Sequence, residues 1–229
     1  MIRTRVPQPN SVEKAREKCL RKFLHYFPKG YRGQKFQHWE RDYKWKAHET
    51  WEQQLGKPLF KQLILEKSYP EIVRRALSIE SRTNLLFSFE KMALRDAVRA
   101  PGNAETFAKE LYAWIYGAGN METKFNSYRD TLASLPVKQT RVVTWPVLTI
   151  FGFIADPHKH IYLKPTVTRM AAAKYQFDFE YSSTPEWNVY QSLLAFAKQV
   201  ATDTKRFEPR DMIDIQSFIW VLGSEEYPD

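Results

Sequence analysis

The stretch Asn84-Leu-Leu-Phe-Ser-Phe-Glu-Lys-Met-Ala-Leu-Arg-Asp-Ala-Val98 determines the fold class that the sequence predicts. It contains good helix formers behind a residue that can cap a helix, and its apolar residues occupy nearly every side of a helical wheel. A helix that is apolar all round is buried, so we expect a central helix of a helical protein here. Glu90, Arg95 and Asp96 would then lie near the core, where charged groups must be paired.

Helical patterns continue on both sides of this stretch. Apolar positions three and four residues apart predict a helix that begins after Asn10 or Ser11 and ends near Pro28. The aromatic and apolar residues Trp39, Tyr43, Ala47 and Trp51 stand four apart and predict a second helix. The predicted helices after the first cover residues 35–55, 59–66, 70–79, 104–116, 121–134, 146–155, 166–175, 185–204 and 209–222.

Three short segments in the second half of the chain have residue patterns that are typical of β-strands rather than helices. Residues 141–145 and 160–163 are rich in β-branched or aromatic side chains, and residues 177–181 alternate strictly between apolar and charged. The predicted fold is therefore mainly α, a multi-helical globular bundle with a small two- to three-strand β element near residues 140–181. We expect a basic helical part over 1–135 and an α+β part over 136–229, packed as one unit.

Composition and charge limit the classes of function. With 43% hydrophobic residues the chain can build a core, and a single cysteine, Cys19, excludes an internal disulfide. No segment reaches the ~20 apolar residues of a membrane span, and the first residues lack the apolar core of a secretory signal. These features predict a cytoplasmic protein with no membrane partner.

The net charge of +9 is concentrated at one end of the sequence. Residues 1–50 contain thirteen Lys or Arg and five Asp or Glu, a balance of +8, whereas the remaining residues contain twenty-two and twenty-one. A basic end on a nearly neutral body indicates a polyanionic partner, although a high net charge also serves solubility alone.

We therefore expect the basic N-terminal quarter to bind nucleic acid, DNA in the first place, through its phosphate backbone. The alternative is that Trp39, Tyr43 and Trp51 form a core stripe and the lysines merely its solvated side. Charge reversal at Lys18, Arg21 and Lys22 should weaken binding to all sequences alike. The candidate binding residues are Lys14, Lys18, Arg21, Lys22, Lys29, Arg32, Lys35, Arg41 and Lys44.

Other chemistries have weaker signals. His158 and His160 could share one side of a strand, but a zinc site needs three or four ligands. Asp178 and Glu180 could hold one divalent ion of a nuclease, yet no lysine follows at the usual spacing. The sequence contains no Gly-x-Ser-x-Gly motif and no glycine-rich phosphate loop. We predict no catalytic residue, no metal and no cofactor.

The last predicted helix carries polar residues inside an apolar run. Asp214 and Gln216 interrupt the apolar residues of Arg210-Asp-Met-Ile-Asp-Ile-Gln-Ser-Phe-Ile-Trp220. Buried polar groups require partners, so we expect Asp214 to form an internal tie to Lys164 or Arg169.

Three stretches, Trp39-Glu-Arg-Asp-Tyr-Lys-Trp45 with Ala47-His48, Leu163-Lys-Pro165, and Arg210–Trp220, together resemble a group of uncharacterised bacterial proteins of about this length. The resemblance implies a prokaryotic source and transfers no catalytic residue. It also suggests a bacterial DNA-metabolism or phage-defence setting. The first hypothesis is a nucleic-acid-binding accessory protein. A protein-interaction or regulatory module and a metal-dependent nuclease are the alternatives.

Overall fold

The computed structural model describes residues 9–138 and 140–229, with side chains from residue 11 onward. The residues on which the expected absence of a secretory signal rests, and the side chain of Asn10, lie outside these ranges. The elements are α1 (Pro9–Tyr26), η1 (Gly30–Arg32), α2 (Gln34–Phe36), η2 (Gln37–Arg41), α3 (Asp42–Leu55), α4 (Lys57–Leu65), α5 (Tyr69–Ser81), α6 (Ser88–Ala97), α7 (Pro101–Tyr116), α8 (Met121–Ser134), α9 (Trp145–Ala155), α10 (Pro165–Lys174), α11 (Trp187–Asp203), η3 (Lys205–Phe207) and α12 (Met212–Gly223).

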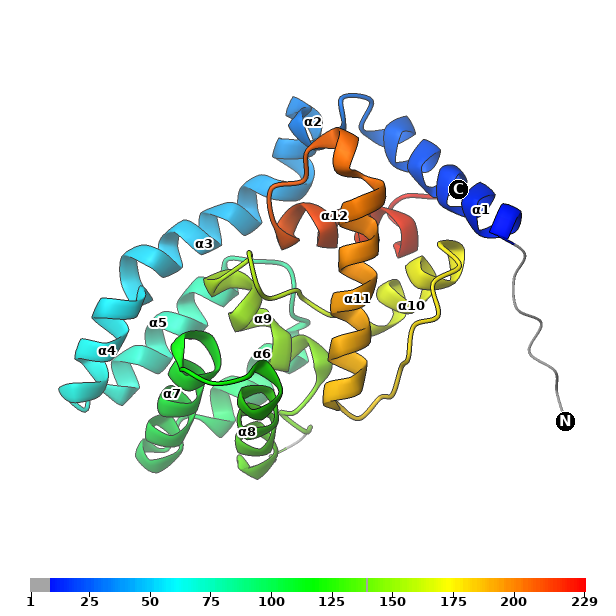
Figure 1. The fold of residues 1–229 in the computed structure, drawn as a ribbon. Coiled ribbons are helices and arrows are strands. Elements are labelled where there is room, and N and C mark those ends of the chain that lie inside the picture. The colour runs from blue at the N-terminus through cyan, green and yellow to red at the C-terminus, as the bar shows by residue number, and fades with distance from the viewer. Residues whose placement is uncertain (1–8, 139) are drawn as a thin grey trace, which may run out of the picture.

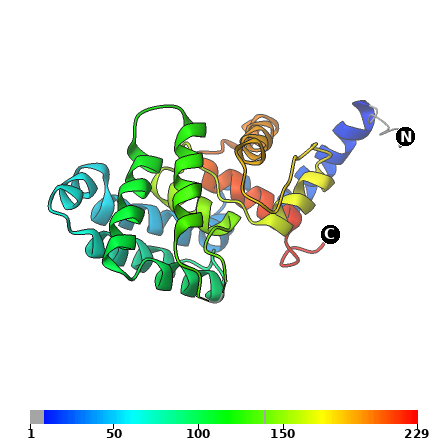
Figure 2. The ribbon, with the colours of Figure 1, turned by 90° about the horizontal axis from the view of Figure 1, so that it is seen from below.

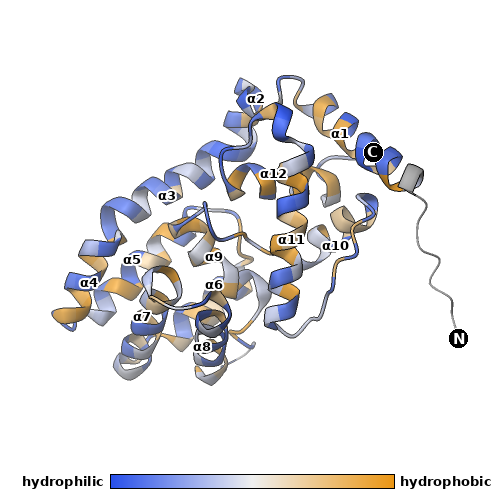
Figure 3. Ribbon diagram, in the orientation of Figure 1, coloured by the Kyte–Doolittle hydropathy of each residue, from blue (hydrophilic) through white to orange (hydrophobic). Residues whose placement is uncertain are grey.

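The helices surround two apolar helices, α9 and α12. α9 contacts α3, α5, α7 and α8, whereas α12 contacts α1, α10, α11 and η2. In Figure 1, α1 and α4 lie at opposite ends of the molecule, and Figure 2 shows α7 and α8 side by side at the end away from α1. Apolar residues are concentrated on α12, while α11 alternates between apolar and polar residues (Figure 3).

The central buried helix is α9 rather than the stretch 84–98. Every residue of α9 is buried, whereas Phe87, Phe89 and Met92 in or beside α6 are 54%, 51% and 45% exposed. α6 turns a mixed side inward, including Glu90, whose carboxylate accepts hydrogen bonds from the Phe87 amide and the Thr144 hydroxyl. The prediction of a central helix at 84–98 was therefore wrong. Glu90 is buried and has partners, as expected, but Asp96 is only half-buried and Arg95 is exposed, contrary to expectation.

The predicted β element is also wrong, because residues 9–138 and 140–229 contain no β-strand. Hydroxyl groups bind backbone amides that a neighbouring strand would otherwise bind. Tyr190 accepts from the amide of Ile161, Thr149 from that of Leu163, and Ser192 from that of Glu180. These segments thus satisfy the buried amides of Ile161 and Leu163, and the exposed amide of Glu180, without strand pairing. The segment 141–145 instead leads into α9.

The helix predicted over 35–55 contains a π turn, η2, between α2 and α3. A π turn inserts an extra residue and shifts the residues before it around the helix. Trp39 lies inside this turn and is 53% exposed, although Ala47 and Trp51 of the same predicted stripe are buried. The same turn directs Glu40 and Arg41 inward, where both are buried.

α10 and α12 cross in direct backbone contact. A Cβ atom at Gly223 would overlap the carbonyl oxygen of Val167 and approach the amide nitrogen of Ala171 to 3.1 Å. Glycine is therefore required for this close approach. The crossing fixes the position of α10, and with it that of Lys174 at the C-terminal end of α10.

Candidate nucleic-acid interface

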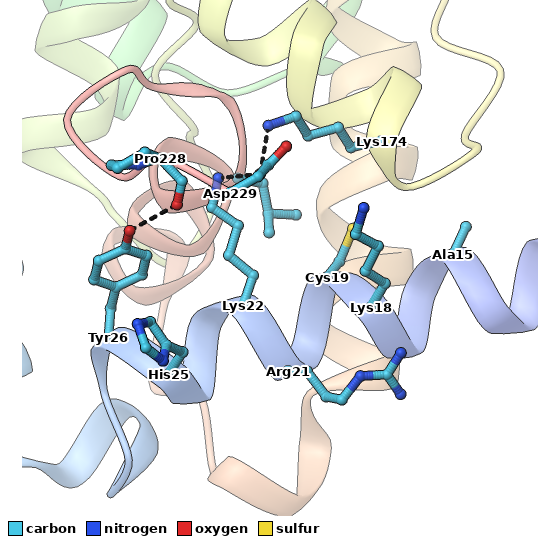
Figure 4. Close-up of a pocket in the computed structure, with 11 residues that line it drawn as sticks. Ala15, Lys18, Cys19, Arg21, Lys22, His25, Tyr26, Lys174, Pro228 and Asp229 are labelled. Carbon is cyan, nitrogen blue, oxygen red and sulfur yellow. Dashed lines mark hydrogen bonds and ion pairs between the residues drawn. The ribbon is translucent and has the colours of Figure 1, made fainter.

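A basic groove lies between α1, the end of α10 and the segment that follows α12. Its volume is about 540 Å³, and among the residues that the structure describes, four cationic side chains but only one carboxylate line it. The cations are Lys18, Arg21, Lys22 and Lys174, and the carboxylate belongs to Asp229. In Figure 4, Lys22 and Lys174 converge on Asp229, whereas Arg21 points away from it. We call this site the basic groove.

The helical repeat places the cations of α1 on one side. At about 100° per residue, positions 14, 18, 21, 22 and 25 fall within about 100° of arc. Lys14, Lys18, Arg21 and His25 are exposed, and Lys22 is half-buried. Arg16 lies on the opposite side, where its guanidinium pairs with Asp203 at 3.4 Å. The cations of α1 therefore form a stripe along one edge of the groove, a narrower distribution than the sequence suggested.

Asp229 is held in the groove by two lysines. The Nζ atoms of Lys22 and Lys174 lie 2.6 Å and 2.8 Å from its Oδ1 atom. Hydrogen bonds from Lys174 and Lys22 lower the pKa of Asp229 to about 2. The Tyr26 hydroxyl also donates to the carbonyl oxygen of Pro228 at 2.6 Å, which anchors the segment. The groove thus already coordinates an anionic oxygen, the kind of ligand that phosphate supplies.

Cys19 forms part of the wall of the groove and is 5% exposed. Burial raises the pKa of its thiol to about 11, so the sulfur is protonated near neutral pH. Because the thiolate is the nucleophilic form of cysteine, Cys19 contributes apolar packing here and no covalent chemistry.

Two of the nine candidate binding residues are not at the surface. Arg41 and Lys44 are 5% and 2% exposed and face α12, so the prediction that they contact phosphates was wrong. Of the remaining candidates, Lys22 is half-buried. The other six are exposed: Lys14, Lys18, Arg21, Lys29, Arg32 and Lys35. Carboxylates from the second half of the chain pair with four N-terminal cations, namely Arg16, Lys22, Arg32 and Arg41.

The buried cations belong to a polar cluster between η2 and α12. Arg41 binds Asp211 at 2.7 Å and Asp214 at 2.9 Å, and Arg210 Nε binds Asp214 at 2.8 Å. Lys44 Nζ lies 3.2 Å from Glu40 and 2.8 Å from the Ser217 hydroxyl. The expected internal tie of Asp214 exists, but its partners are Arg41 and Arg210 rather than Lys164 or Arg169.

Asp211 shows how this cluster responds to acid. Burial alone would raise its pKa, but the hydrogen bond and charge of Arg41, with the amides of Asp214 and Ile213, outweigh burial and lower it. A carboxylate with a lowered folded-state pKa contributes stability above its ordinary pKa and loses it as the pH falls further. The Asp211 carboxylate therefore remains ionised throughout the neutral range.

Two residues of the groove, Lys174 and Asp229, were missed by sequence reasoning. They lie far from α1 in sequence and reach it only because α10 and α12 pack beside it. The stripe on α1, in contrast, could have been found from the 3.6-residue repeat of the helix alone.

Among the described residues, the histidines and carboxylates considered above for a metal or nuclease site do not form a ligand cluster. His160 is buried against Trp114, with 4.4 Å between ring centroids, while His158 is exposed. Asp178 and Glu180 are both exposed. Within the described part of the chain, no group of three or more His, Cys, Asp or Glu side chains is placed to hold a metal ion.

Comparison of the chain with protein-family models, curated proteins and solved structures found no match. None of the helices in the described ranges combines the length and apolar character needed to cross a membrane.

Asp229 leads to a prediction about affinity. The change Asp229→Asn removes the carboxylate charge that pairs with Lys22 and Lys174, so the affinity for duplex DNA that the sequence predicts should rise roughly tenfold near 0.1 M salt. Fluorescence anisotropy measures this change. Asp130→Asn on α8 removes one negative charge far from the groove and should have little effect. An equal gain in both variants would show that only net charge matters.

Proposed function

We propose that the protein binds nucleic acid by contacting phosphates through the basic groove and the cationic stripe of α1. The observation that supports this most directly is the Asp229 carboxylate between Lys22 and Lys174, because a phosphate oxygen would make the same contacts. Lys14, Lys18 and Arg21 extend the positive surface along the helix. Such contacts carry no base information, so binding should be insensitive to sequence.

The salt dependence of binding tests this function. With Lys14, Lys18, Arg21, Lys22 and Lys174 each contacting one phosphate, the slope of log K against log salt should be about −4.5 for duplex DNA. Anisotropy titrations with duplex DNA, single-stranded DNA and RNA at several salt concentrations measure the slope for each. An affinity that does not change between low and physiological salt would refute the proposal.

A protein-binding role is the second candidate, and it is supported by the exposed apolar side chains of Phe87, Phe89 and Met92. Aromatic side chains of this kind often anchor protein partners. Chromatography separates the two roles. A monomer that heparin retains and salt releases supports nucleic-acid binding, whereas a salt-insensitive oligomer supports a protein interface.

A further inference from the structure

The segment that follows α12 also contributes to a second cavity. Its volume is about 200 Å³, and it adjoins a cleft of about 660 Å³ with which it shares Phe87, Lys164, Trp220 and Glu226. The walls of the smaller cavity include Trp39, Tyr43, Lys44, Lys164, Gln216 and Trp220. We call it the Gln216 cavity.

Gln216 gives this cavity a polar site with a specific requirement. Its side chain is 3% exposed, and among the described residues no hydrogen-bond partner contacts its Oε1 atom. Buried amide groups are ordinarily hydrogen-bonded, so an unsatisfied amide on a residue that lines a cavity points to a ligand, which the buried Oε1 atom meets when the side chain rotates toward the cavity. An amide offers both an acceptor and donors, as does the edge of a nucleobase.

The charges of the Gln216 cavity differ from those of the basic groove. Two cations, Lys44 and Lys164, are balanced by two carboxylates, Glu40 and Glu226. Lys164 is also partly buried, and this burial lowers its pKa although the charge of Glu90 opposes the shift. A balanced, partly desolvated site favours an uncharged polar ring over a phosphate.

Aromatic rings form much of the wall. Trp39 is 53% exposed, and the Lys35 ammonium lies 4.4 Å from its ring centroid. Trp220 is half-buried, and its Nε1 donates to Glu226 at 3.2 Å. Base–aromatic stacking accepts any base, because every base presents a flat face. The cavity therefore combines surfaces for stacking with an amide for the base edge.

The position of the cavity links it to the basic groove. Glu226 lines the cavity and Asp229, three residues later, lines the groove. Three residues span at most about 11 Å, so the two sites lie close together. The three stretches 39–45, 163–165 and 210–220, noted above for their resemblance, also each contribute residues to this cavity.

We propose that the Gln216 cavity binds one unpaired base of a nucleic-acid strand whose phosphates contact the basic groove. This inference rests on the proposed function and adds to it a preference for single-stranded or locally opened nucleic acid. A base in a duplex has its edge paired and its faces stacked, so it cannot enter the cavity without being extruded.

The test compares an intact single strand, the same strand with abasic sites, and its duplex in anisotropy titrations. The wild-type protein should bind the intact strand about 10- to 100-fold more tightly than the abasic strand. Trp39→Ala and Gln216→Met should remove this difference while leaving duplex affinity and the salt slope unchanged. Leu65→Ala, an exposed apolar residue of α4, is the matched control and should keep the difference.

Calorimetric titration with free nucleosides separates the two proposals, because nucleosides carry no phosphate. Nucleoside binding that Gln216→Met abolishes would support the cavity even if no oligonucleotide bound, and in that case the proposed function alone would fail. Oligonucleotide binding with the expected salt slope, but with equal affinity for intact and abasic strands and no nucleoside binding, would overturn the cavity alone. Thermal denaturation confirms that each variant is folded.

Discussion

Replacement of Asp214 by alanine should lower the free energy of unfolding by about 3–5 kcal/mol, because it leaves buried charges without their partner. Asp214 is fully buried and accepts hydrogen bonds from Arg41 at 2.9 Å and from the Arg210 side chain at 2.8 Å. It also accepts a hydrogen bond from the backbone amide of Arg210 at 2.9 Å. In the variant, Arg41 would keep only the Asp211 carboxylate as an ion-pair partner, and Arg210 would lose the Asp214 carboxylate that it pairs with.

Thermal denaturation measures this loss. For a chain of this size, each kcal/mol corresponds to about 2–4 °C, so Tm should fall by roughly 6–20 °C. Asp178→Ala removes an exposed carboxylate and should change stability by less than about 0.5 kcal/mol. If Asp214→Ala had the same small effect as Asp178→Ala, the cluster between η2 and α12 would not stabilise the fold.

Reversal of three charges on α1 should nearly abolish binding to nucleic acid. The structure favours Lys14→Glu, Lys18→Glu and Arg21→Glu over a set that includes Lys22, because reversal of Lys22 would also repel Asp229 and so disturb the wall of the groove. Near 0.1 M salt each lost phosphate contact lowers the affinity about eightfold, so the loss of three contacts lowers it roughly 500-fold. The Arg21–Glu17 pair, at 3.7 Å, is exposed and should contribute little to stability.

A matched triple variant on another surface tests whether the position of the charges matters. Lys57, Lys61 and Lys67 are exposed in or just after α4, which lies at the opposite end of the molecule from α1 (Figure 1). Their reversal changes the net charge by the same amount but should leave most of the affinity intact. Equal losses in both triple variants would mean that the groove has no special role.

The helices could largely be predicted from sequence because their signals are local. The spacing of apolar residues placed α1, and the last predicted helix, over 209–222, lies within a few residues of α12. Strand prediction failed because alternation and β-branching describe an extended chain and do not identify its hydrogen-bond partners. Here those partners are hydroxyls such as Tyr190 and Thr149, which approach only in the folded protein.

The candidate site was predictable only in part for the same reason. The cations of α1 are readable from the sequence, but the burial of Arg41 and Lys44 depends on a π turn for which the sequence has no clear signal. The sequence contains two strongly apolar helical stretches, 84–98 and α9, and only the folded protein shows that other helices cover α9 more completely. Lys174 and Asp229 enter the groove through contacts across more than half of the chain length.

The contact between the backbones at Gly223 also affects how the protein would meet a ligand. Because α10 cannot slide along α12, the Lys174 backbone is already in place before any anion arrives. Preorganisation of this kind reduces the entropy that association must otherwise remove from the receptor. A bulkier residue at position 223 would therefore loosen one wall of the binding surface as well as the core, and recognition would weaken along with folding.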